Sequence, residues 1–480
     1  MIGNQERWQE DLFVAGPLRD LIPDDHVLKR VDKVLDLSWL RREVADCYCE
    51  DNGRPGIDPE AAVRLMLAGL FQGIVHDRKL MREAQVNLAI RWFAGYRLHE
   101  KLPDHSSLTR IRQRWGAERF KRIFQRTVQA CCEAGLVNGE TVHIDATLIR
   151  ADVSWESLTA RHVEGVLEAN SEDDSPDEPP CRKRGRPRSK PKSAKKYSPT
   201  DPDATMATSC KQYHLEPCYK QHTAVDDQAG VVIDVEVTTG EASEGKQLPE
   251  QLDRIEANTG RKVLTVTADG GYAHSANYAE LETRNIDAVI LPQRENTKPK
   301  CIPLRRFKYD GKHRHIRCPG GRILHPFGRA KNGRWYRAKR EDCQQCRLGE
   351  RCLSSNIARR SVLIVDEYEA LLRARRRKAQ GWDPPDRRAY SRHRWRVEGA
   401  HGEAKTRHGL RRAARRGLAN VAIQSYLTAA VMNLKRLAAL LRLFLPLLTS
   451  DRTPSAAGEH FGRAIANYST TEIRHLQRAA

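Results

Sequence analysis

The sequence lacks both a visible signal peptide and an uncharged hydrophobic run long enough to cross a membrane. Its first residues, MIGNQERWQEDLF, are polar from the start, whereas a secretory signal needs a continuous apolar segment near the N-terminus. The longest apolar run, residues 421–450, is interrupted by Lys435, Arg436 and Arg442, so we expect a packing helix rather than a membrane span. These absences favour a cytoplasmic protein whose twelve cysteines are reduced thiols or metal ligands rather than disulfides.

Acidic residues are few relative to basic ones. The 480 residues include 83 Lys and Arg against 62 Asp and Glu, which gives a formal net charge of +21. A positive surface field of this kind attracts polyanions, most commonly nucleic acid, with an acidic membrane surface as the competing partner. The length allows two or three domains.

Residues 1–138 show the apolar spacing of an all-helical region. The segment 102–136 predicts two helices separated by a break near Gly116. Several short helices with basic residues suit a helix-turn-helix-like DNA-binding domain, in which Arg110 and Arg112 would contact phosphates. The alternative is a plain helical domain with a solvated basic face.

The pattern changes after Gly139, and residues 139–440 alternate between strand-like and helical segments. Strands interleaved with helices predict an α/β domain with a sheet flanked by helices. The expected strands are 141–148, 262–272 and 287–292, with a β-hairpin over 219–240 and a helix over 244–260. The remaining tail, residues 441–480, carries no chemistry that its sequence identifies.

An acidic run followed by a basic run interrupts this domain at residues 171–200. Such a composition predicts a segment that is disordered when free. Its centre, RGRPR (184–188), is similar to the AT-hook, in which Arg184 and Arg186 would enter a narrow A·T minor groove. A nonspecific basic linker is the alternative.

A second insert, residues 296–358, is rich in cysteine. Cys318, Cys343, Cys346 and Cys352 include one Cys-x₂-Cys pair, a spacing that lets two thiolates reach one tetrahedral ion. We therefore predict a small Cys₄ insert with a structural zinc ion. Cys301 could replace one ligand, and four reduced cysteines without metal are the alternative.

Two aspartates, Asp145 and Asp269, lie on the polar faces of predicted strands. Carboxylates from adjacent strands can converge, and they raise each other's pKa unless a divalent cation neutralises them. For either aspartate alone, a strand-end carboxylate bonded to turn amides is an equally simple interpretation.

A third acid, Glu398, lies in a strongly basic helical segment. On an α-helix it projects about 40° from Arg394, and Lys405 projects about 20° from Glu398, so the three share one stripe. An exposed Arg–Glu pair is worth only a few tenths of a kcal/mol, so energy does not favour the simple salt bridge over a metal ligand beside DNA. Glu403 is the rival third acid, on the opposite side of the helix.

Together, the segments HIDATLIRA, TADGGYA and RWRVEGAHGEAKTRHGLRRA resemble the motifs of bacterial insertion-sequence transposases of the DDE class. In the most similar branch the third motif reads Tyr-x₂-Arg-x₃-Glu-x₆-Lys. Arg394, Glu398 and Lys405 match this spacing, whereas Tyr390 falls one residue early. The resemblance spans about residues 5–440 and implies an RNase H-like core behind a helical N-terminal domain.

The resemblance also implies a function. Asp145, Asp269 and Glu398 would hold two Mg²⁺ or Mn²⁺ ions, and Arg394 and Lys405 would contact DNA at the transposon end. The protein would bind the terminal inverted repeats of an insertion sequence as a homodimer, cleave there and transfer the 3′ ends to target DNA, in association with the nucleoid. A metal-dependent nuclease without strand transfer and a noncatalytic DNA-binding protein remain the alternatives.

Overall fold

The chain forms two compact units, each assembled from segments that are far apart in the sequence. A computed structural model describes residues 16–49, 56–154, 158–160, 196–207, 215–293, 301–353 and 357–448. The first unit contains Met1–Leu136, Ile149–Tyr219 and Gly402–Ala480, and the second contains Val137–Leu148 and Lys220–His401. The predicted division at residue 138 is therefore incomplete, because the N-terminal helices share their unit with the C-terminal segment.

The first unit is mainly helical, as the sequence predicts. Its longest N-terminal helix, α6 (His105–Glu133), begins where the carboxylate of Asp104 accepts a hydrogen bond from the Ser106 amide, and it bends at Gly116, whose φ is 71°. The other N-terminal helices are α1 (Val27–Asp32), α2 (Leu40–Glu43), α3 (Pro59–Phe71), α4 (Asp77–Val86) and α5 (Leu88–Phe93), with 3₁₀ turns at Leu18–Leu21 and Ala45–Cys47.

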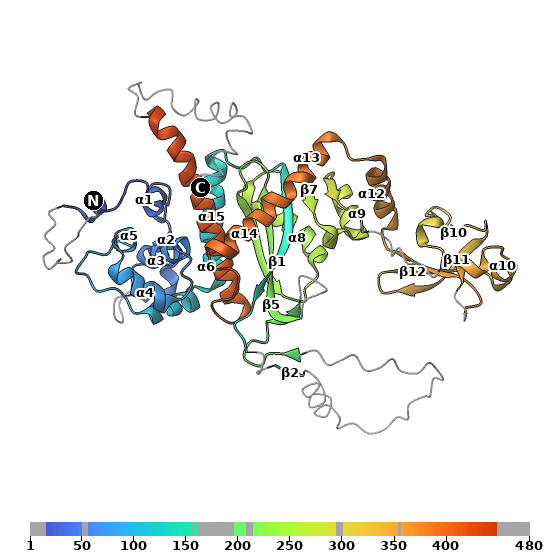
Figure 1. Cartoon of the computed structure of the whole chain (residues 1–480), viewed down its shortest axis with the longest axis horizontal. Helices are drawn as coiled ribbons and strands as arrows, with labels where there is room; N and C mark the ends of the chain where they lie inside the picture. The colour runs from blue at the N-terminus through green and yellow to red at the C-terminus, as the bar shows by residue number, and fades with distance from the viewer. Residues whose placement is uncertain are drawn as a thin grey trace, which may run out of the picture. The chain divides into compact units, whose positions relative to one another are not determined.

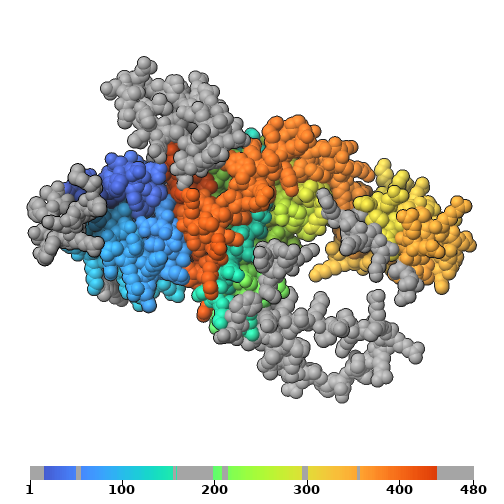
Figure 2. All heavy atoms as spheres, viewed as in Figure 1, coloured from blue at the N-terminus to red at the C-terminus, as the bar shows by residue number. Residues whose placement is uncertain are grey.

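The C-terminal helix α15 (Leu418–Leu448) packs against α6 and α3. In Figure 2 its orange-to-red atoms adjoin the blue atoms of the N-terminal helices. Phe124 stacks on Tyr426 with ring centroids 6.4 Å apart, so α15 completes the core of this unit. No helix among the described residues is long and apolar enough to cross a membrane. Residues 441–448, expected to begin a tail, instead continue α15.

The second unit is built on a mixed sheet whose strands run in the order β6-β5-β1-β7-β8; Figure 1 labels β5, β1 and β7 of this sheet. If these five strands are numbered by their order along the chain, the order across the sheet is 3-2-1-4-5. Strand β1 pairs in parallel with β7, and β7 pairs in parallel with β8. The sheet is RNase H-like, as predicted. The strands are β1 (Thr141–Arg150), β5 (Glu216–Asp226), β6 (Val232–Thr239), β7 (Thr265–Ala268) and β8 (Asp287–Ile290), and β4 (Thr205–Ala207) pairs with the start of β5.

Helices connect and cover these strands. Helix α8 (Leu248–Thr259) packs on β6 and ends at Gly260, which adopts the left-handed conformation typical of a C-terminal cap. Helix α9 (Ser275–Thr283) packs on β8. Helix α13 (Pro384–His393) crosses β7 and β8 and leads through a π-helical turn, Arg394–Glu398, into α14 (Gly399–Arg407).

The cysteine-rich insert is a separate antiparallel sheet in the order β13-β12-β11-β10-β9. Because β13 belongs to this sheet, the insert extends beyond its predicted boundary at residue 358. The strands are β9 (Lys308–Asp310), β10 (His315–Arg317), β11 (Ile323–Ala330), β12 (Gly333–Arg337) and β13 (Ser361–Val365), with short helices α10 (Arg340–Gln344) and α11 (Gly349–Cys352), and α12 (Tyr368–Gln380) follows.

The acidic and basic insert lies largely outside the described residues. It is bordered by a two-stranded ladder of β2 (Thr159–Ala160) and β3 (Lys196–Tyr197). Arg184 and Arg186, the predicted minor-groove contacts, lie outside the described part of the chain.

Candidate active site

Asp145 and Asp269 are brought together by the pairing of β1 with β7. The parallel register sets His143 beside Thr267 and Ile144 beside Ala268. Continuing it by one residue sets Asp145 beside Asp269, at the end of β7. Because neighbouring strands lie only about 4.8 Å apart, two carboxylates 124 positions apart in the sequence lie side by side on adjacent interior strands of the sheet.

The charges of these acids act on one another. Burial, together with the negative charges of Asp269, Glu244 and Glu398, raises the pKa of Asp145 to about 7, against the opposing effect of a hydrogen bond from the Ala146 amide. Burial, assisted by the charge of Glu244, also raises the pKa of Asp269. Three predicted acids and one unpredicted acid therefore form a single electrostatic cluster, in which a divalent cation would relieve the repulsion.

Each acid also has a local partner. Oδ1 of Asp269 accepts a 2.7 Å hydrogen bond from the Gly271 amide, which is the turn contact that the simpler interpretation expected. Glu398 and Arg394 form an ion pair with Nε and Oε2 3.3 Å apart, and both side chains are largely exposed. An exposed pair of this type is worth at most about 1 kcal/mol, so it leaves Glu398 available to another cation.

The helix that carries Glu398 contains a π-helical turn at Arg394–Glu398. A π turn accommodates one additional residue within a helix and is frequent at functional sites. Tyr390 stacks on His393, and the charge of Asp269 contributes, after burial, to raising the pKa of its hydroxyl.

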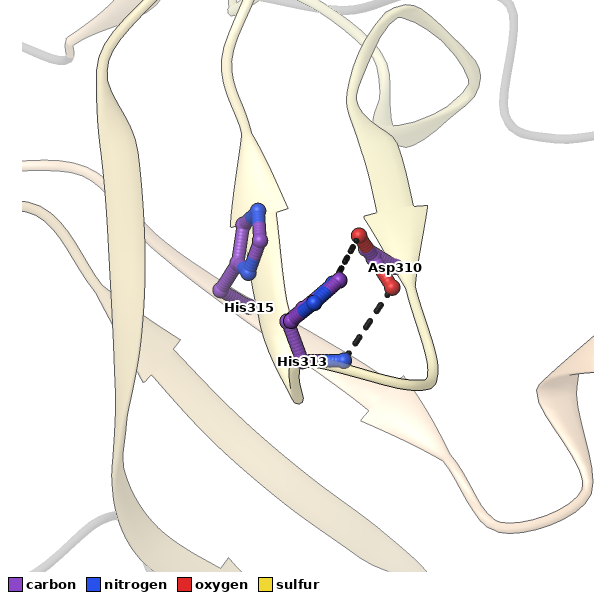
Figure 3. Close-up of side chains that lie close together, drawn as sticks. All are labelled: Asp310, His313 and His315. Atoms are coloured by element: carbon purple, nitrogen blue, oxygen red, sulfur yellow. Dashed lines mark hydrogen bonds and ion pairs between the residues drawn. The ribbon is translucent and has the colours of Figure 1, made fainter.

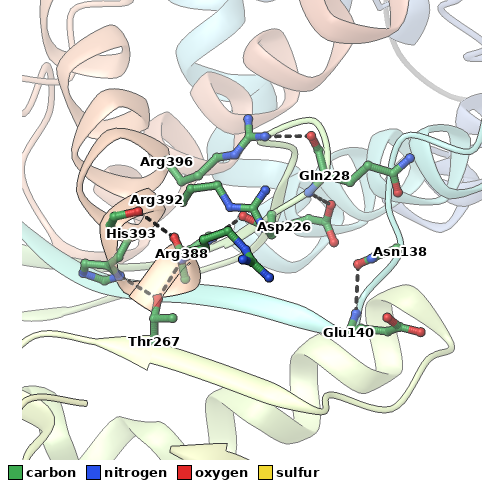
Figure 4. Close-up of polar contacts among 12 residues, drawn as sticks. Asn138, Glu140, Asp226, Gln228, Thr267, Arg388, Arg392, His393 and Arg396 are labelled. Atoms are coloured by element: carbon green, nitrogen blue, oxygen red, sulfur yellow. Dashed lines mark hydrogen bonds and ion pairs between the residues drawn. The ribbon is translucent and has the colours of Figure 1, made fainter. Parts of the chain in front are cut away.

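A buried hydrogen-bond network begins two residues before each aspartate, at His143 on β1 and Thr267 on β7. The hydroxyl of Thr267 contacts Nδ1 of His143 at 2.7 Å and Nδ1 of His393 at 2.8 Å (Figure 4 shows the contact to His393). Nε2 of His143 contacts Asp227 at 2.9 Å, and Asp227 also pairs with Arg392. The network joins β1, β7, α13 and the hairpin between β5 and β6.

The pattern of partners assigns the protons in this network. Because Asp227 accepts from Nε2 of His143, Nδ1 of His143 accepts from the Thr267 hydroxyl, whose oxygen accepts in turn from His393. Both imidazoles are then neutral. Burial is the main cause of the lowered pKa of His143, and burial together with the neighbouring His143 lowers the pKa of His393 to about 4.

A second set of contacts holds the π turn to the β5–β6 hairpin (Figure 4). Arg396 is buried and donates a 2.7 Å hydrogen bond to the carbonyl oxygen of Gln228. Asp226 accepts from the amides of Gly139 and Gln228 at 2.9 and 2.8 Å. The helix that carries Glu398 is therefore held to the second unit by Arg392 and His393 just before the π turn and by Arg396 within it.

Several residues that border the acids carried no clear signal in the sequence. Glu244 pairs with Lys220 at 3.0 Å, and a Cβ added to Gly271 would lie 2.5 Å from Oε2 of Glu244. The hydroxyl of Tyr272 is buried and has no hydrogen-bond partner among the described residues. Nδ1 of His401 lies 3.7 Å from Oδ2 of Asp145, and its position three residues after Glu398 could have indicated it.

The rival acid, Glu403, does not belong to this cluster. It lies in the first unit, where it pairs with Lys435, Arg436 and His408. Burial alone would raise its pKa, but the hydrogen bond from His408 and the two cations lower it overall. Lys405 also falls in the first unit, as a half-buried residue of α14.

The two arginines predicted to contact phosphate differ in environment. Arg110 is exposed on α6. Arg112 is only 6% exposed and forms two hydrogen bonds to Asp77, at 2.7 and 2.9 Å. The prediction for Arg112 is wrong, because its guanidinium neutralises a buried carboxylate that also pairs with Arg415.

The four predicted cysteine ligands line one small cavity in the insert, and Cys301 does not border it. Burial raises the pKa of the Cys352 thiol, and the nearby Cys343, Cys318 and Cys346 raise it further against the opposing charge of Arg360. A Cβ added to Gly320 would lie 3.0 Å from Sγ of Cys346 and 3.7 Å from Sγ of Cys318, so glycine permits this close approach. Neither these sulfurs nor the acids of the active-site cluster include three ligand atoms that are all within 4.8 Å of one another, so bound ions would draw them closer.

Two family models match the sequence. Residues 16–114 match the Transposase domain (DUF772), and residues 194–434 match the Transposase DDE domain. The second segment contains Asp269 and Glu398 but begins after Asp145. No curated protein sequence matches the chain.

Solved transposase structures show a distant likeness. A piggyBac transposase synaptic complex with hairpin DNA is 11% identical, with a TM-score of 0.30, 92% of this chain and 84% of that chain being covered. A Mos1 transposase paired-end complex with the left transposon end is 12% identical, with a TM-score of 0.16 and coverage of 53% and 66%. Because these TM-scores are low, the family is identified by the sequence models. Since the Transposase DDE domain model matches just over half of its residues, the chain belongs to the DDE transposases, the enzymes that carry out DNA transposition.

Proposed function

We propose that Asp145, Asp269 and Glu398 are the catalytic acids of this transposase, which cleaves DNA at the ends of an insertion sequence and joins the 3′ ends to target DNA. The observation that carries this assignment is the adjacency of Asp145 and Asp269 on parallel strands, together with the effect of the Glu398 charge on Asp145. A buried carboxyl group whose pKa is raised by burial and by neighbouring acids, as that of Asp145 is, is typical of a functional site.

DDE transposases use divalent metal ions, and we propose Mg²⁺ or Mn²⁺ for this one. The donors are carboxylate oxygens, which hard cations prefer. The buried hydroxyl of Tyr272, which lacks a described partner and is affected by the charges of Asp145 and Asp269, suits a polar group within the cluster. Ions held there would activate the attacking oxygen and stabilise the leaving oxygen of the phosphodiester.

The side chains around the acids have distinct proposed roles. Glu244 orients or supplements the metal ligands, since its charge acts on both aspartates. Arg394 is 83% exposed and can exchange Glu398 for a DNA phosphate once a metal ion neutralises that glutamate. Lys405 would contact a phosphate as a mobile single charge.

The proposed DNA partners are the terminal inverted repeats and a target duplex. Arg110 is exposed on the helical unit and would add a phosphate contact there. Joining two transposon ends requires two active sites, so we propose a homodimer in the DNA complex. Because the substrate is chromosomal DNA, we propose a cytoplasmic location in association with the nucleoid.

We also propose a structural zinc ion bound by Cys318, Cys343, Cys346 and Cys352. Four thiolates around one cavity suit the tetrahedral coordination of Zn²⁺. Metal analysis of protein purified without chelators should find about one tightly bound zinc per chain that is held by these cysteines. Loss of that zinc in Cys343→Ser, with retention in Cys301→Ser, is the expected contrast; equal zinc in both variants would contradict the ligand set.

The catalytic proposal is tested with DNA from the regions that flank the gene for this chain. We expect cleavage in Mg²⁺, none in EDTA, and joining of the liberated 3′ end to a target duplex. Asp145→Asn should still bind this DNA but not cut it. Asp287→Asn should cut normally, because Asp287 begins β8 and lies at the opposite end of the parallel strands from Asp269. Cleavage without joining would identify a nuclease, and binding without cleavage in any divalent metal would identify a DNA-binding protein.

A further inference from the structure

Three metal-binding side chains meet at a hairpin of the insert, away from its cysteines. Strand β9 ends with Asp310, and β10 begins with His315, which is the cross-strand partner of Asp310. The turn between them contains His313, so the sequence Asp-x₂-His-x-His is folded back on itself. Figure 3 shows the two imidazoles and the carboxylate on neighbouring parts of this hairpin.

The nitrogen and oxygen atoms of these three side chains are close enough together to bind one metal ion. Nδ1 of His313 lies 2.8 Å from Oδ2 of Asp310, and the His313 amide donates a 3.2 Å hydrogen bond to Oδ1 of Asp310. One ligand atom from each of Asp310, His313 and His315 can be chosen so that all lie within 4.8 Å of one another. Among the described residues, this is the only group of three His, Cys, Asp or Glu side chains that does so.

We propose that Asp310, His313 and His315 bind a divalent first-row transition-metal ion, such as Zn²⁺ or Ni²⁺, at a site separate from the acids and the cysteines. Two imidazole nitrogens and one carboxylate oxygen suit these ions, whereas Mg²⁺ prefers oxygen donors. Metal–ligand bonds of about 2.0–2.2 Å require ligand atoms about 3–3.5 Å apart, which the side chains reach by small rotations. Three protein ligands leave at least one coordination position open.

The hairpin holds this arrangement through its backbone. Arg314, between the two histidines, has φ of 48°, a left-handed conformation that is costly for a residue with a side chain. A Cβ added to Gly311 would lie 1.8 Å from Oε1 of Glu369, so the carboxylate of that glutamate lies directly against the turn. The backbone conformation of Arg314 and the position of Glu369 against Gly311 together restrict the path of the chain from Asp310 to His315.

A simpler interpretation is a turn stabilised by the hydrogen bonds between Asp310 and His313. It accounts for those two residues but not for the placement of His315 opposite Asp310.

The test is metal binding by the full-length protein in excess Mg²⁺, which occupies oxygen-rich sites. Metal-free protein is titrated with Co²⁺, because cysteine ligation gives intense sulfur-to-cobalt absorption and ligation by nitrogen and oxygen gives only weak visible bands. We expect one Co²⁺ per chain that gives only the weak visible bands of nitrogen and oxygen ligation. Its affinity should fall by at least about tenfold in Asp310→Asn and in His315→Ala, since the loss of outer-shell partners alone costs roughly 10–100-fold.

His325→Ala is the matched control, because His325 is exposed on β11 of the same insert and lies outside the set. It should bind Co²⁺ as the wild type does. Equal affinity in the wild type and in both ligand variants, or the absence of weak-band binding in the wild type, would overturn the proposal. Circular dichroism confirms that the variants fold, and DNA cleavage in Mg²⁺ is measured separately, so failure of this site leaves the catalytic proposal unaffected.

Discussion

Asp145→Asn should make the metal-free protein more stable while abolishing its activity. Asp145 is ionised in the unfolded chain above its ordinary pKa of 3.8, whereas its pKa in the folded protein is raised to about 7 by burial and by Asp269, Glu244 and Glu398. The folded state therefore binds this proton more tightly than the unfolded state. Stability is lost as the pH rises from about 4 through about 7, and the loss is complete above pH 7.

The difference between the two pKa values corresponds to about 4 kcal/mol at pH 8. Local relaxation and water entry reduce this, so we expect Asp145→Asn to gain about 1–3 kcal/mol in free energy of unfolding, or several degrees in Tm. The gain should shrink as the pH falls towards 4, where the carboxyl group is neutral in both states. Added Mg²⁺ should raise the Tm of the wild type but not that of the variant.

The assay is thermal unfolding in EDTA and in Mg²⁺ at pH 8 and pH 5, with DNA cleavage measured in parallel. Asp226→Asn is the matched control. Burial raises the pKa of Asp226 to about 6, but this residue accepts hydrogen bonds from two backbone amides, so its substitution should destabilise the protein and leave the response to Mg²⁺ intact. If Asp145→Asn were no more stable than the wild type at pH 8 in EDTA, the acids would not form the proposed cluster.

Four other substitutions test the site and its surroundings. Thr267→Val keeps the shape of the side chain but leaves two buried imidazoles without their hydroxyl, so urea unfolding should show a loss of about 1–3 kcal/mol. Gly271→Ala forces the carboxylates of Glu244 and Asp269 to move, because the added Cβ would lie 2.5 and 2.9 Å from their oxygens, and it should raise the Mg²⁺ concentration needed for half-maximal cleavage; an unchanged requirement would argue against a role for Glu244. Arg110→Ala should lower DNA affinity and reduce the slope of its salt dependence by about one ion. Arg112→Met should instead cost up to roughly 3–5 kcal/mol of stability while leaving the affinity of the folded fraction unchanged, and the reverse pattern would refute the buried ion pair.

Local periodicity was sufficient to predict most of the sheet. The alternation around Asp145 identified β1, the hairpin over 219–240 appears as β5 and β6, and Gly260 ends α8 as expected. These features depend on neighbours within a few residues. The strand over 262–272 was too long, because Gly270–Tyr272 forms a 3₁₀ turn capped by Asp269, and the polar pattern alone did not distinguish a strand from its capping turn.

Features that depend on distant partners were harder to predict. Arg110 and Arg112 are two positions apart and equally basic, yet only Arg112 meets the buried carboxylate of Asp77 from another helix. Glu244 is the first residue of the helix predicted over 244–260, and nothing near it in the sequence indicates that its charge acts on Asp145. The shared core of the first unit was missed for the same reason, since α6 and α15 are separated by the whole second unit.

The position of α15 has a consequence for how the protein is synthesised. The thiol of Cys131 contacts the carbonyl oxygen of Asn433, 302 positions later, and both residues are fully buried. A growing polypeptide therefore exposes the apolar face of α6 on the ribosome until nearly all of the chain has been translated. Premature termination or proteolytic loss of the final helix should yield an aggregation-prone N-terminal fragment that depends on chaperones rather than an independently folding DNA-binding module.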